Sequence, residues 1–155
     1  MSNQHRGGDS TKGPVPGSRF PVPATVDPEA WPRGSGYAHG MAAEGRSIFV
    51  AGQIGWDPVT QTIVAGGMAA QVRQALTNIV AVLATAGAEP AHLVRLTWFV
   101  TDRDLYLRER QAIGTAYREA IGRHYPAMSV LVVAGLLEEQ AVVEIEATAV
   151  VPSRS

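Results

Sequence analysis

The sequence predicts an α+β domain in which two helices cover one face of a mixed sheet, with elements in the order ββαβαββ. Two segments place apolar residues every three or four positions, which is the pattern of an amphipathic helix. Five shorter segments alternate apolar and polar residues or are rich in β-branched ones, as strands are. The chain has 155 residues, 46% of them hydrophobic, which fits one ordinary domain.

The N-terminal part of the chain is expected to be a tail. Residues 1–35 hold six of the ten prolines and many glycines and serines, and they show no apolar period. A docked extended piece around Phe20 to Pro23 or Trp31 is the alternative to flexibility, because exposed aromatic residues usually find a surface. We expect a flexible tail over 1–35, a single domain over 36–151 and a short C-terminal tail over 152–155.

The first half of the domain predicts a hairpin followed by a helix. Tyr37 to Ala43 and Ser47 to Gln53 flank Glu44-Gly45, a tight-turn signature, so we expect these segments to pair as a β-hairpin. A helix is expected over Gly66 to Ala86, ended by Gly87. Its apolar stripe consists of Met68, Val72, Leu76, Ile79, Leu83 and Ala86.

The second half predicts strand, helix and two further strands. Leu93 to Thr101 is expected to be a strand that uses both faces, because apolar side chains occur in both of its alternating sets. Asp102 or Asp104 can cap a second helix that finishes before Pro126. The core-facing stripe of this helix consists of Tyr106, Ile113, Tyr117 and Ala120. The closing strands are expected over Met128 to Val133 and Val142 to Val150.

The crossovers leave one face of the predicted sheet uncovered. Strands joined through helices imply parallel crossovers, and successive right-handed crossovers place both helices on the same face. On the last strand the apolar set suits the helices, whereas the opposite set mixes apolar with ionisable groups. The first set is Val143, Ile145, Ala147 and Ala149, and the second is Val142, Glu144, Glu146 and Thr148. Copies of the same chain are the simplest cover for such a face, which predicts a closed cyclic oligomer with sites at subunit boundaries.

Composition excludes several classes of protein. The formal net charge is −1 and charged residues make up 17%, so there is no basic excess to neutralise nucleic-acid phosphates. The longest apolar run, Val130 to Leu137, is far shorter than the roughly 20 residues that a membrane-spanning helix needs. The polar first residues are followed by no stretch of signal-peptide type, so we expect a cytoplasmic location.

Metal binding is not expected. The chain has no cysteine, which excludes disulfides, thiolate nucleophiles and zinc–thiolate sites. The histidines form no pair at helical ligand spacing and have no clustered carboxylates beside them. They are His5, His39, His92 and His124.

Eight segments, spread from Gly36 to Val150 and in the same order, resemble the YjgF-like family, also called the Rid family. Several segments in register are far more specific than any one of them. They are Gly36-Tyr37, Phe49 to Ile54, Asp57-Pro58, Gln71 with Leu76 to Ile79, Leu83 to Ala88, Phe99 to Asp102, Tyr125 to Ser129 and Val143 to Ala147.

This resemblance implies a chorismate-mutase-like fold and a homotrimer. The three sheets of the trimer would form a central barrel-like core, with helices outside and small-molecule clefts between neighbouring subunits. Deaminase members of the family hydrolyse an imine or enamine to a carbonyl product and ammonia without a cofactor. Two alternative functions are open: a small-molecule binding trimer without activity, and an endoribonuclease, a label that some relatives carry. The endoribonuclease is disfavoured because the only lysine is Lys12, in the predicted tail.

The resemblance also assigns site residues. Tyr37 corresponds to an aromatic residue lining the cleft, Ala51 and Gly52 to a loop that exposes backbone amides to the ligand, and Glu144 to the acid that orients the attacking water. A purely structural role is open for each of three positions: Tyr37 as an interface aromatic, Gly52 as a bulge, and Glu144 in an ion pair with Arg95. Glu146 lies on the same strand face as Glu144, although the family motif favours Glu144.

The main departure from the family pattern is Met128. In the deaminases an arginine at this position clamps the substrate carboxylate, and methionine offers only an adaptable apolar surface. Val130 makes the expected pocket more apolar still. Arg110 is a candidate replacement cation, because it falls close to a cleft position of the family and interrupts an apolar stripe. Gln111 is its one-residue-shifted rival, and a solvated helix arginine is the alternative.

Overall fold

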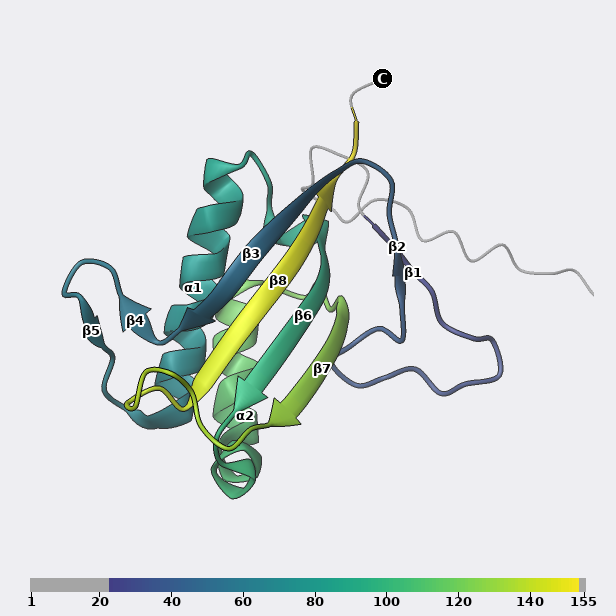
Figure 1. Ribbon diagram of the computed structural model, residues 1–155. Coiled ribbons are helices and arrows are strands. Elements are labelled where there is room, and N and C mark those ends of the chain that lie inside the picture. Colours follow the sequence, from purple (N-terminus) through teal and green to yellow (C-terminus); the bar gives the residue numbers. More distant parts are fainter. Residues whose placement is uncertain (1–22, 154–155) are drawn as a thin grey trace, which may run out of the picture.

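The computed structural model describes residues 23–153, which form a four-stranded mixed sheet with two long helices packed on one face (Figure 1). The strand order is β3-β8-β6-β7. Strand β8 runs antiparallel to both β3 and β6, and β6 runs parallel to β7. The elements are β3 (Arg46–Ile54), α1 (Gly67–Thr85), β6 (Leu93–Val100), α2 (Arg103–Ala120), β7 (Ala127–Val132) and β8 (Val143–Val151). The predicted α+β class with both helices on one face is confirmed.

Both helices form where the apolar spacing predicted them. Five of the six predicted stripe residues of α1, Met68, Val72, Leu76, Ile79 and Leu83, are completely buried. Helix α2 begins after Asp102, whose carboxylate accepts the Leu105 N–H at 2.8 Å and thereby satisfies one of the free donors at the helix start. Of the two predicted caps, Asp102 is therefore the one used.

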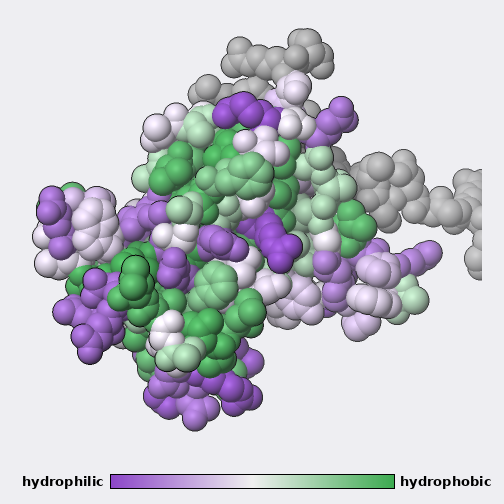
Figure 2. Space-filling view, viewed as in Figure 1, coloured by the Kyte–Doolittle hydropathy of each residue, from purple (hydrophilic) through white to green (hydrophobic). Residues whose placement is uncertain are grey.

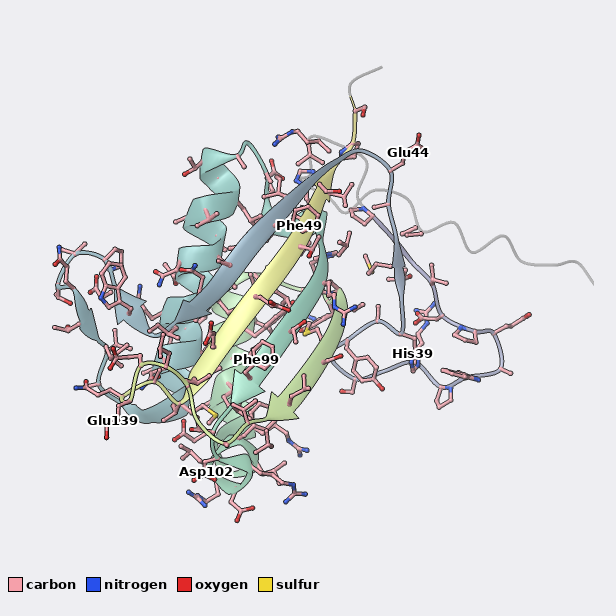
Figure 3. All side chains as sticks on the ribbon, viewed as in Figure 1. His39, Glu44, Phe49, Phe99, Asp102 and Glu139 are labelled. Atoms are coloured by element: carbon pink, nitrogen blue, oxygen red, sulfur yellow. The ribbon has the colours of Figure 1, made fainter. Side chains whose placement is uncertain are left out.

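The helices meet the sheet through alternate strand residues. The predicted inner set of β8, Val143, Ile145, Ala147 and Ala149, is buried in the core together with Leu96, Trp98 and Val100 of β6. Phe49 lies on the opposite face with 78% of its surface exposed, and Figure 3 shows it with Phe99 on the side turned away from the helices. Apolar and polar side chains lie side by side across this open face (Figure 2). No element among residues 23–153 covers it.

The predicted N-terminal hairpin is wrong. The segment after Tyr37 contributes only β2 (Met41–Ala42), and it pairs with β1 (Ala24–Thr25) rather than with β3. The turn at Gly45 lies against the end of β8 instead: Gly45 has φ +146°, and a Cβ there would overlap the Val151 carbonyl. The chain therefore crosses the end of β8 at this turn, and β3 takes β8 as its partner.

The segment before the turn forms an arm beside β7, at the far edge of the sheet from β3. Ala38 bridges to Ala127 at the start of β7, with its N–H donated to the Pro126 carbonyl at 3.1 Å. The arm is also held internally, because the Asp27 carboxylate accepts the His39 N–H at 3.0 Å. Short strands β4 (Trp56–Asp57) and β5 (Thr62–Ile63) and the turn η1 (Pro90–His92) complete the structure.

The predicted tails fall largely outside the described residues. Of the segment 1–35, residues 1–22 lie outside them, and residues 23–35 belong to the arm, in which Ala24–Thr25 form β1. Residues 154–155 of the C-terminal segment are also outside. The division into tails and one domain stays a prediction. Within the described part, neither helix is long and apolar enough to cross a membrane.

Candidate functional site

A cavity of 780 Å³ lies between helix α2, strands β6 and β7, and the arm. Tyr37, together with Ser35 and Gly36, closes one side of it. Met128 and Val130 point into it from β7, because they are paired with Leu96 and Trp98 on the helix-facing side of the neighbouring strand. Four sequence-predicted site residues therefore meet here: Tyr37, Arg110, Met128 and Val130.

Stacked aromatic rings form the inner wall of the cavity. Trp98 stacks on Tyr117 with ring centroids 6.3 Å apart, and Tyr117 stacks on Tyr125 at 5.3 Å. The Tyr117 hydroxyl donates to the His124 carbonyl at 2.6 Å, which fixes the middle ring. Burial raises the pKa of the Tyr117 hydroxyl well above its usual range, so this group stays protonated and serves as a structural donor.

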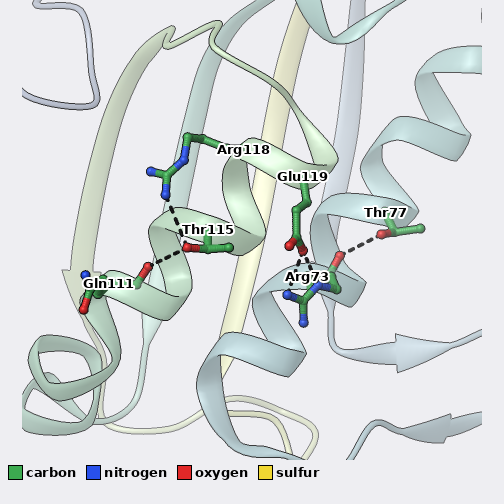
Figure 4. A network of polar contacts seen from close by, with 6 residues as sticks. All are labelled: Arg73, Thr77, Gln111, Thr115, Arg118 and Glu119. Carbon is green, nitrogen blue, oxygen red and sulfur yellow. Dashed lines mark hydrogen bonds and ion pairs between the residues drawn. The ribbon is translucent and has the colours of Figure 1, made fainter.

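Helix α2 supplies the positively charged wall. Tyr106, Arg110, Gly114 and Arg118 follow one another at four-residue intervals and therefore share one face of the helix, and all four line the cavity. Burial raises the pKa of Tyr106, and the nearby Arg110 guanidinium opposes that shift. Arg118 donates to the Thr115 hydroxyl at 3.2 Å, within the contacts drawn in Figure 4.

Of the two rival positions on this helix, Arg110 reaches the cavity wall and Gln111 does not. The backbone carbonyl of Gln111 accepts a hydrogen bond from the Thr115 hydroxyl at 3.2 Å (Figure 4). On the far side of α2, the Glu119 carboxylate binds Arg73 of α1 at 2.7 Å and joins the two helices. The guanidinium of Arg110 forms no ion pair with the residues that the structure describes.

Glu144, Gly52 and Ala51 come together elsewhere, on the open face of the sheet. Strand β3 has an irregularity between Val50 and Gln53, so that Ala51 and Gly52 drop out of the register with β8. Glu144 lies against this bulge, and a Cβ on Gly52 would overlap its Oε1 atom. A side chain at position 52 would therefore displace the Glu144 carboxylate from this place. The sequence alternative of a bulge at Gly52 and the assigned role at the site are thus compatible.

Arg95, the expected ion-pair partner of Glu144, lies beside Glu146 instead. Arg95 lines a 200 Å³ hollow of the open face together with Glu146 and Phe49, and Glu144 does not line it. Across the strands, Glu144 is opposite Ile54 on one side and Phe99 on the other. No ion pair between Arg95 and Glu144 is formed within the described chain.

The two groups of site residues therefore lie on opposite faces of one sheet. Met128 and Val130 share the helix-facing side with Leu96 and Trp98. Glu144 shares the open side with Phe99. A single chain does not bring the cavity and the Glu144 carboxylate into one site.

A buried glutamine fixes the loop that leads into β8. The Gln71 amide of α1 donates to the Gln140 carbonyl and its Oε1 accepts the Val142 N–H, both at 2.9 Å. These two bonds hold the backbone just before Glu144. In the sequence Gln71 stands out only as part of the family resemblance, which does not indicate this role.

Two of the histidines, His92 and His124, make hydrogen bonds that hold the local structure. His124 donates from Nε2 to the Leu93 carbonyl at 2.7 Å, and burial lowers its pKa. His92 accepts the Glu89 N–H on Nδ1 at 3.0 Å, and burial lowers its pKa as well. No group of three or more His, Asp or Glu side chains with metal-binding geometry occurs among residues 23–153.

Comparison with known proteins assigns this chain to a family. A family model described as Endoribonuclease L-PSP matches residues 29–151. The crystal structure of YyfB from Yersinia pestis, of the Rid protein family, is similar with a TM-score of 0.73 and 31% identity, covering 84% of this chain and 99% of that one. The chain belongs to the YjgF/Rid family. The resemblance predicted from its sequence is thereby confirmed.

Other relatives agree with this assignment. The YjgF gene product of E. coli is 34% identical with a TM-score of 0.60, covering 82% of this chain and 98% of that one. A 2-iminobutanoate/2-iminopropanoate deaminase from Capra hircus is 34% identical over 105 residues, 68% of this chain and 73% of the relative. A RutC family protein from Synechocystis is 36% identical over 133 residues, 85% of this chain and 92% of the relative.

Sequence reasoning missed most of the aromatic wall of this YjgF/Rid protein. The apolar spacing predicts Tyr106 and Tyr117 in the core stripe of α2, and it indicates no functional role for Trp98 of β6. The spacing signal was correct, since Tyr117 and Trp98 are buried. What it could not reveal is that the same side chains border a cavity, because the cavity is made by α2, β7 and the arm together.

Proposed function

We propose that this YjgF/Rid protein is an imine or enamine deaminase that works as a homotrimer, with each site shared by two subunits. The observation that carries the proposal is the Glu144 carboxylate seated on the bulge at Gly52. The relatives named 2-iminobutanoate/2-iminopropanoate deaminase support the reaction class.

The trimer is supported by surfaces that a single chain leaves bare. Phe49 is 78% exposed on the open face, and Leu131 on β7 is 44% exposed. Exposed apolar area of this kind usually marks an interaction surface. If the open face of one subunit receives the β7 edge of the next, the cavity of one chain and the Glu144 carboxylate of its neighbour face the same cleft. Cyclic symmetry then produces three identical sites.

The proposed hydrolysis requires only a few functions from the protein. An iminium carbon is already electrophilic, so the site must hold the substrate, orient one water and move protons. The Glu144 carboxylate takes a proton as water adds to the carbon, and the resulting carbinolamine carries hydroxyl and amine on the same atom. Glu144 returns that proton to the amine, the C–N bond breaks, and the hydroxyl becomes a carbonyl as its proton passes to the departing ammonia. Iminium and water thus give a carbonyl product and ammonium.

Substrate binding falls to the cavity. Met128 replaces the carboxylate-binding arginine that the deaminases carry at this position, so the cation must come from elsewhere in the wall. Arg110 is the proposed replacement, since it lines the cavity and forms no ion pair in the described chain. Tyr37 and Val130 complete the contact surface, and the backbone of Ala51 and Gly52 supplies amides from the neighbouring subunit. The proposed chemistry needs no cofactor and no metal.

The test is ammonia release from imines generated in situ, with two matched variants. Glu144→Gln removes the proton acceptor and should reduce turnover by at least about a hundredfold, the usual worth of a positioned acid–base group. Glu44→Gln changes an exposed carboxylate in the turn before β3, which lines neither the cavity nor the hollow of the open face, and should leave turnover within about twofold.

The outcome separates two functions. Release that exceeds the buffer rate in wild type and Glu44→Gln but not in Glu144→Gln supports the deaminase. If all three proteins match the buffer rate, the catalytic proposal fails. The cavity then belongs to a ligand-binding trimer without activity.

A further inference from the structure

The helical wall of the cavity carries two arginines. Arg110 and Arg118 both line the cavity, and neither forms an ion pair with the residues that the structure describes. No aspartate or glutamate is among the described residues that line this cavity. An occupant therefore meets two positive charges, whereas one carboxylate needs only one.

The nearby carboxylates of α2 are directed towards helix α1 and do not neutralise these arginines. The Glu109 carboxylate accepts the Ala69 N–H in the first turn of α1 at 2.7 Å. The Glu119 carboxylate binds Arg73 of α1, also at 2.7 Å. The two sides of α2 thus differ in charge: its carboxylates hold α1, and its cavity side is positive.

The guanidinium of Arg118 is held back along the helix, over Gly114. Its Nη2 donates to the Thr115 hydroxyl at 3.2 Å (Figure 4), and its Nη1 lies 3.4 Å from the place that a Cβ on Gly114 would take. Because Gly114 has no side chain, the guanidinium can lie against the helix at this point. The Nη1 group makes no hydrogen bond in the described chain, so its N–H donors are open to an anion in the cavity.

The spacing of the two cations sets the size of an occupant that reaches both. Gly114 is four residues from Arg110 and eight from Tyr106, whose pKa the Arg110 guanidinium lowers against the effect of burial. At the helical rise per residue, the two guanidiniums are therefore about 6–12 Å apart along α2. A single carboxylate does not span this distance, but two carboxylates joined by a short chain do. Met128 and Val130, which line the same cavity from β7, offer apolar surface to the methylene groups of such a chain.

We propose that Arg118 forms a second anion subsite in the cavity, so that the ligand is a dicarboxylic acid whose two carboxylates bind Arg110 and Arg118. The indole N–H of Trp98, buried in the same wall without an acceptor in the described chain, has no surface that a ligand can reach and takes no part. The binding does not depend on the proposed deamination. Combined with that proposed function, it names the substrate class as the imine of a dicarboxylic acid and Arg118 as a residue that determines specificity.

The experiment compares the binding of adipate and hexanoate, which have the same number of carbons and differ by one carboxylate. Binding to the full-length protein is followed at low ionic strength by NMR of ¹³C-labelled methionine methyl groups. The chain has four methionines, of which Met128 lines the cavity and Met68 is completely buried in the core. Met128→Leu assigns the cavity signal, and the Met68 signal is the internal control.

We expect both acids to shift the Met128 signal, and adipate to bind about five- to tenfold more tightly, as one charge-assisted contact at a partly solvated site allows. In Arg118→Gln the advantage of adipate should fall to about twofold or less, because only one carboxylate then has a cation. Arg108→Gln removes the same charge from an exposed position of α2 outside the cavity wall and should keep the advantage. Arg118 is itself exposed, so its replacement should not impair folding.

Three results would overturn the inference. The first is equal affinity of adipate and hexanoate for the wild-type protein. The second is an equal loss of the adipate advantage in Arg108→Gln and Arg118→Gln, which would indicate a diffuse positive surface in place of a subsite. The third is a Met128 signal that neither acid moves. Failure of the proposed deamination is distinguishable, because ammonia release then stays at the buffer rate while adipate still binds and shifts the Met128 signal.

Discussion

Replacing Gly114 by alanine should stabilise the protein and weaken its ligand binding at the same time. Gly114 is the one glycine inside α2, and a helix-interior glycine costs about 1 kcal/mol relative to alanine. An added Cβ has room, because its nearest neighbour is the Nη1 atom of Arg118 at 3.4 Å, the end of a flexible side chain. We therefore expect a gain of up to about 1 kcal/mol, or roughly 2–4 °C in Tm for a chain of this size.

The same methyl group projects from the wall of the cavity, where the substrate is expected to lie. Overpacking by one methyl group costs about 1 kcal/mol or more, which raises the KM of a 2-imino acid roughly fivefold. Gln111→Ala, on the same helix but outside the cavity wall, should leave binding unchanged. Unfolding is followed at fixed protomer concentration, and KM is measured from ammonia release. A Gly114→Ala protein that is more stable yet has the wild-type KM would refute the placement of the substrate against this wall.

Three further predictions test other parts of the structure. Gln71→Leu leaves the Gln140 carbonyl and the half-buried Val142 N–H without their side-chain partner and should lower the free energy of unfolding by about 1–2 kcal/mol in a denaturant titration. A loss below about 0.5 kcal/mol would contradict the role of Gln71. Because burial lowers the pKa of His124, the unfolded chain binds the proton more readily, so stability should fall as the pH drops below about 6.5 towards the folded-state pKa, by up to about 1.4 kcal/mol per pH unit. The free energy of unfolding, measured by urea titration from pH 7 to 5, should fall less steeply with pH in His124→Gln than in wild type. Equal pH dependences in the two proteins would contradict this role of His124. Met128→Arg should raise turnover of a small 2-imino acid about tenfold or more, since a charge-assisted pair with the substrate carboxylate is restored. Adding Glu144→Gln should abolish the gain. Ammonia release from wild type, Met128→Arg and the double variant tests this, and equal rates in all three would contradict it.

The elements of the sheet and both helices follow from periodicity, because burial of one face controls which residues are apolar. The inner set of β8 and the stripe of α1 are buried as predicted. The hairpin failed for a physical reason: the composition of Glu44-Gly45 specifies a turn but not which strand lies beyond it. Strand β3 instead pairs with β8, far along the chain, and the Gly45 turn lies against the Val151 backbone at the end of that pairing.

The candidate site was predictable only in part. Arg110 was recognisable because a charge interrupts an apolar stripe, and the structure does place it in the cavity wall. Met128 and Val130 followed from the family resemblance. The unpartnered indole of Trp98 carries no sequence signal, since a strand tryptophan in a core set looks the same whether or not its N–H finds an acceptor. Such a feature depends on which groups the tertiary structure brings near the ring.

The most direct test of the shared site is a subunit-mixing experiment. Glu144→Gln subunits keep the cavity, and Arg110→Glu subunits keep the carboxylate on the open face, so each protein alone should be inactive. The two are unfolded together, refolded at equal concentration, and assayed for ammonia release. In randomly mixed trimers about a quarter of the sites pair an intact cavity with an intact Glu144 from the neighbour, so we predict about a quarter of the wild-type activity. Activity no higher than that of the separate variants, in mixed trimers verified by mass spectrometry, would contradict a site made from two subunits.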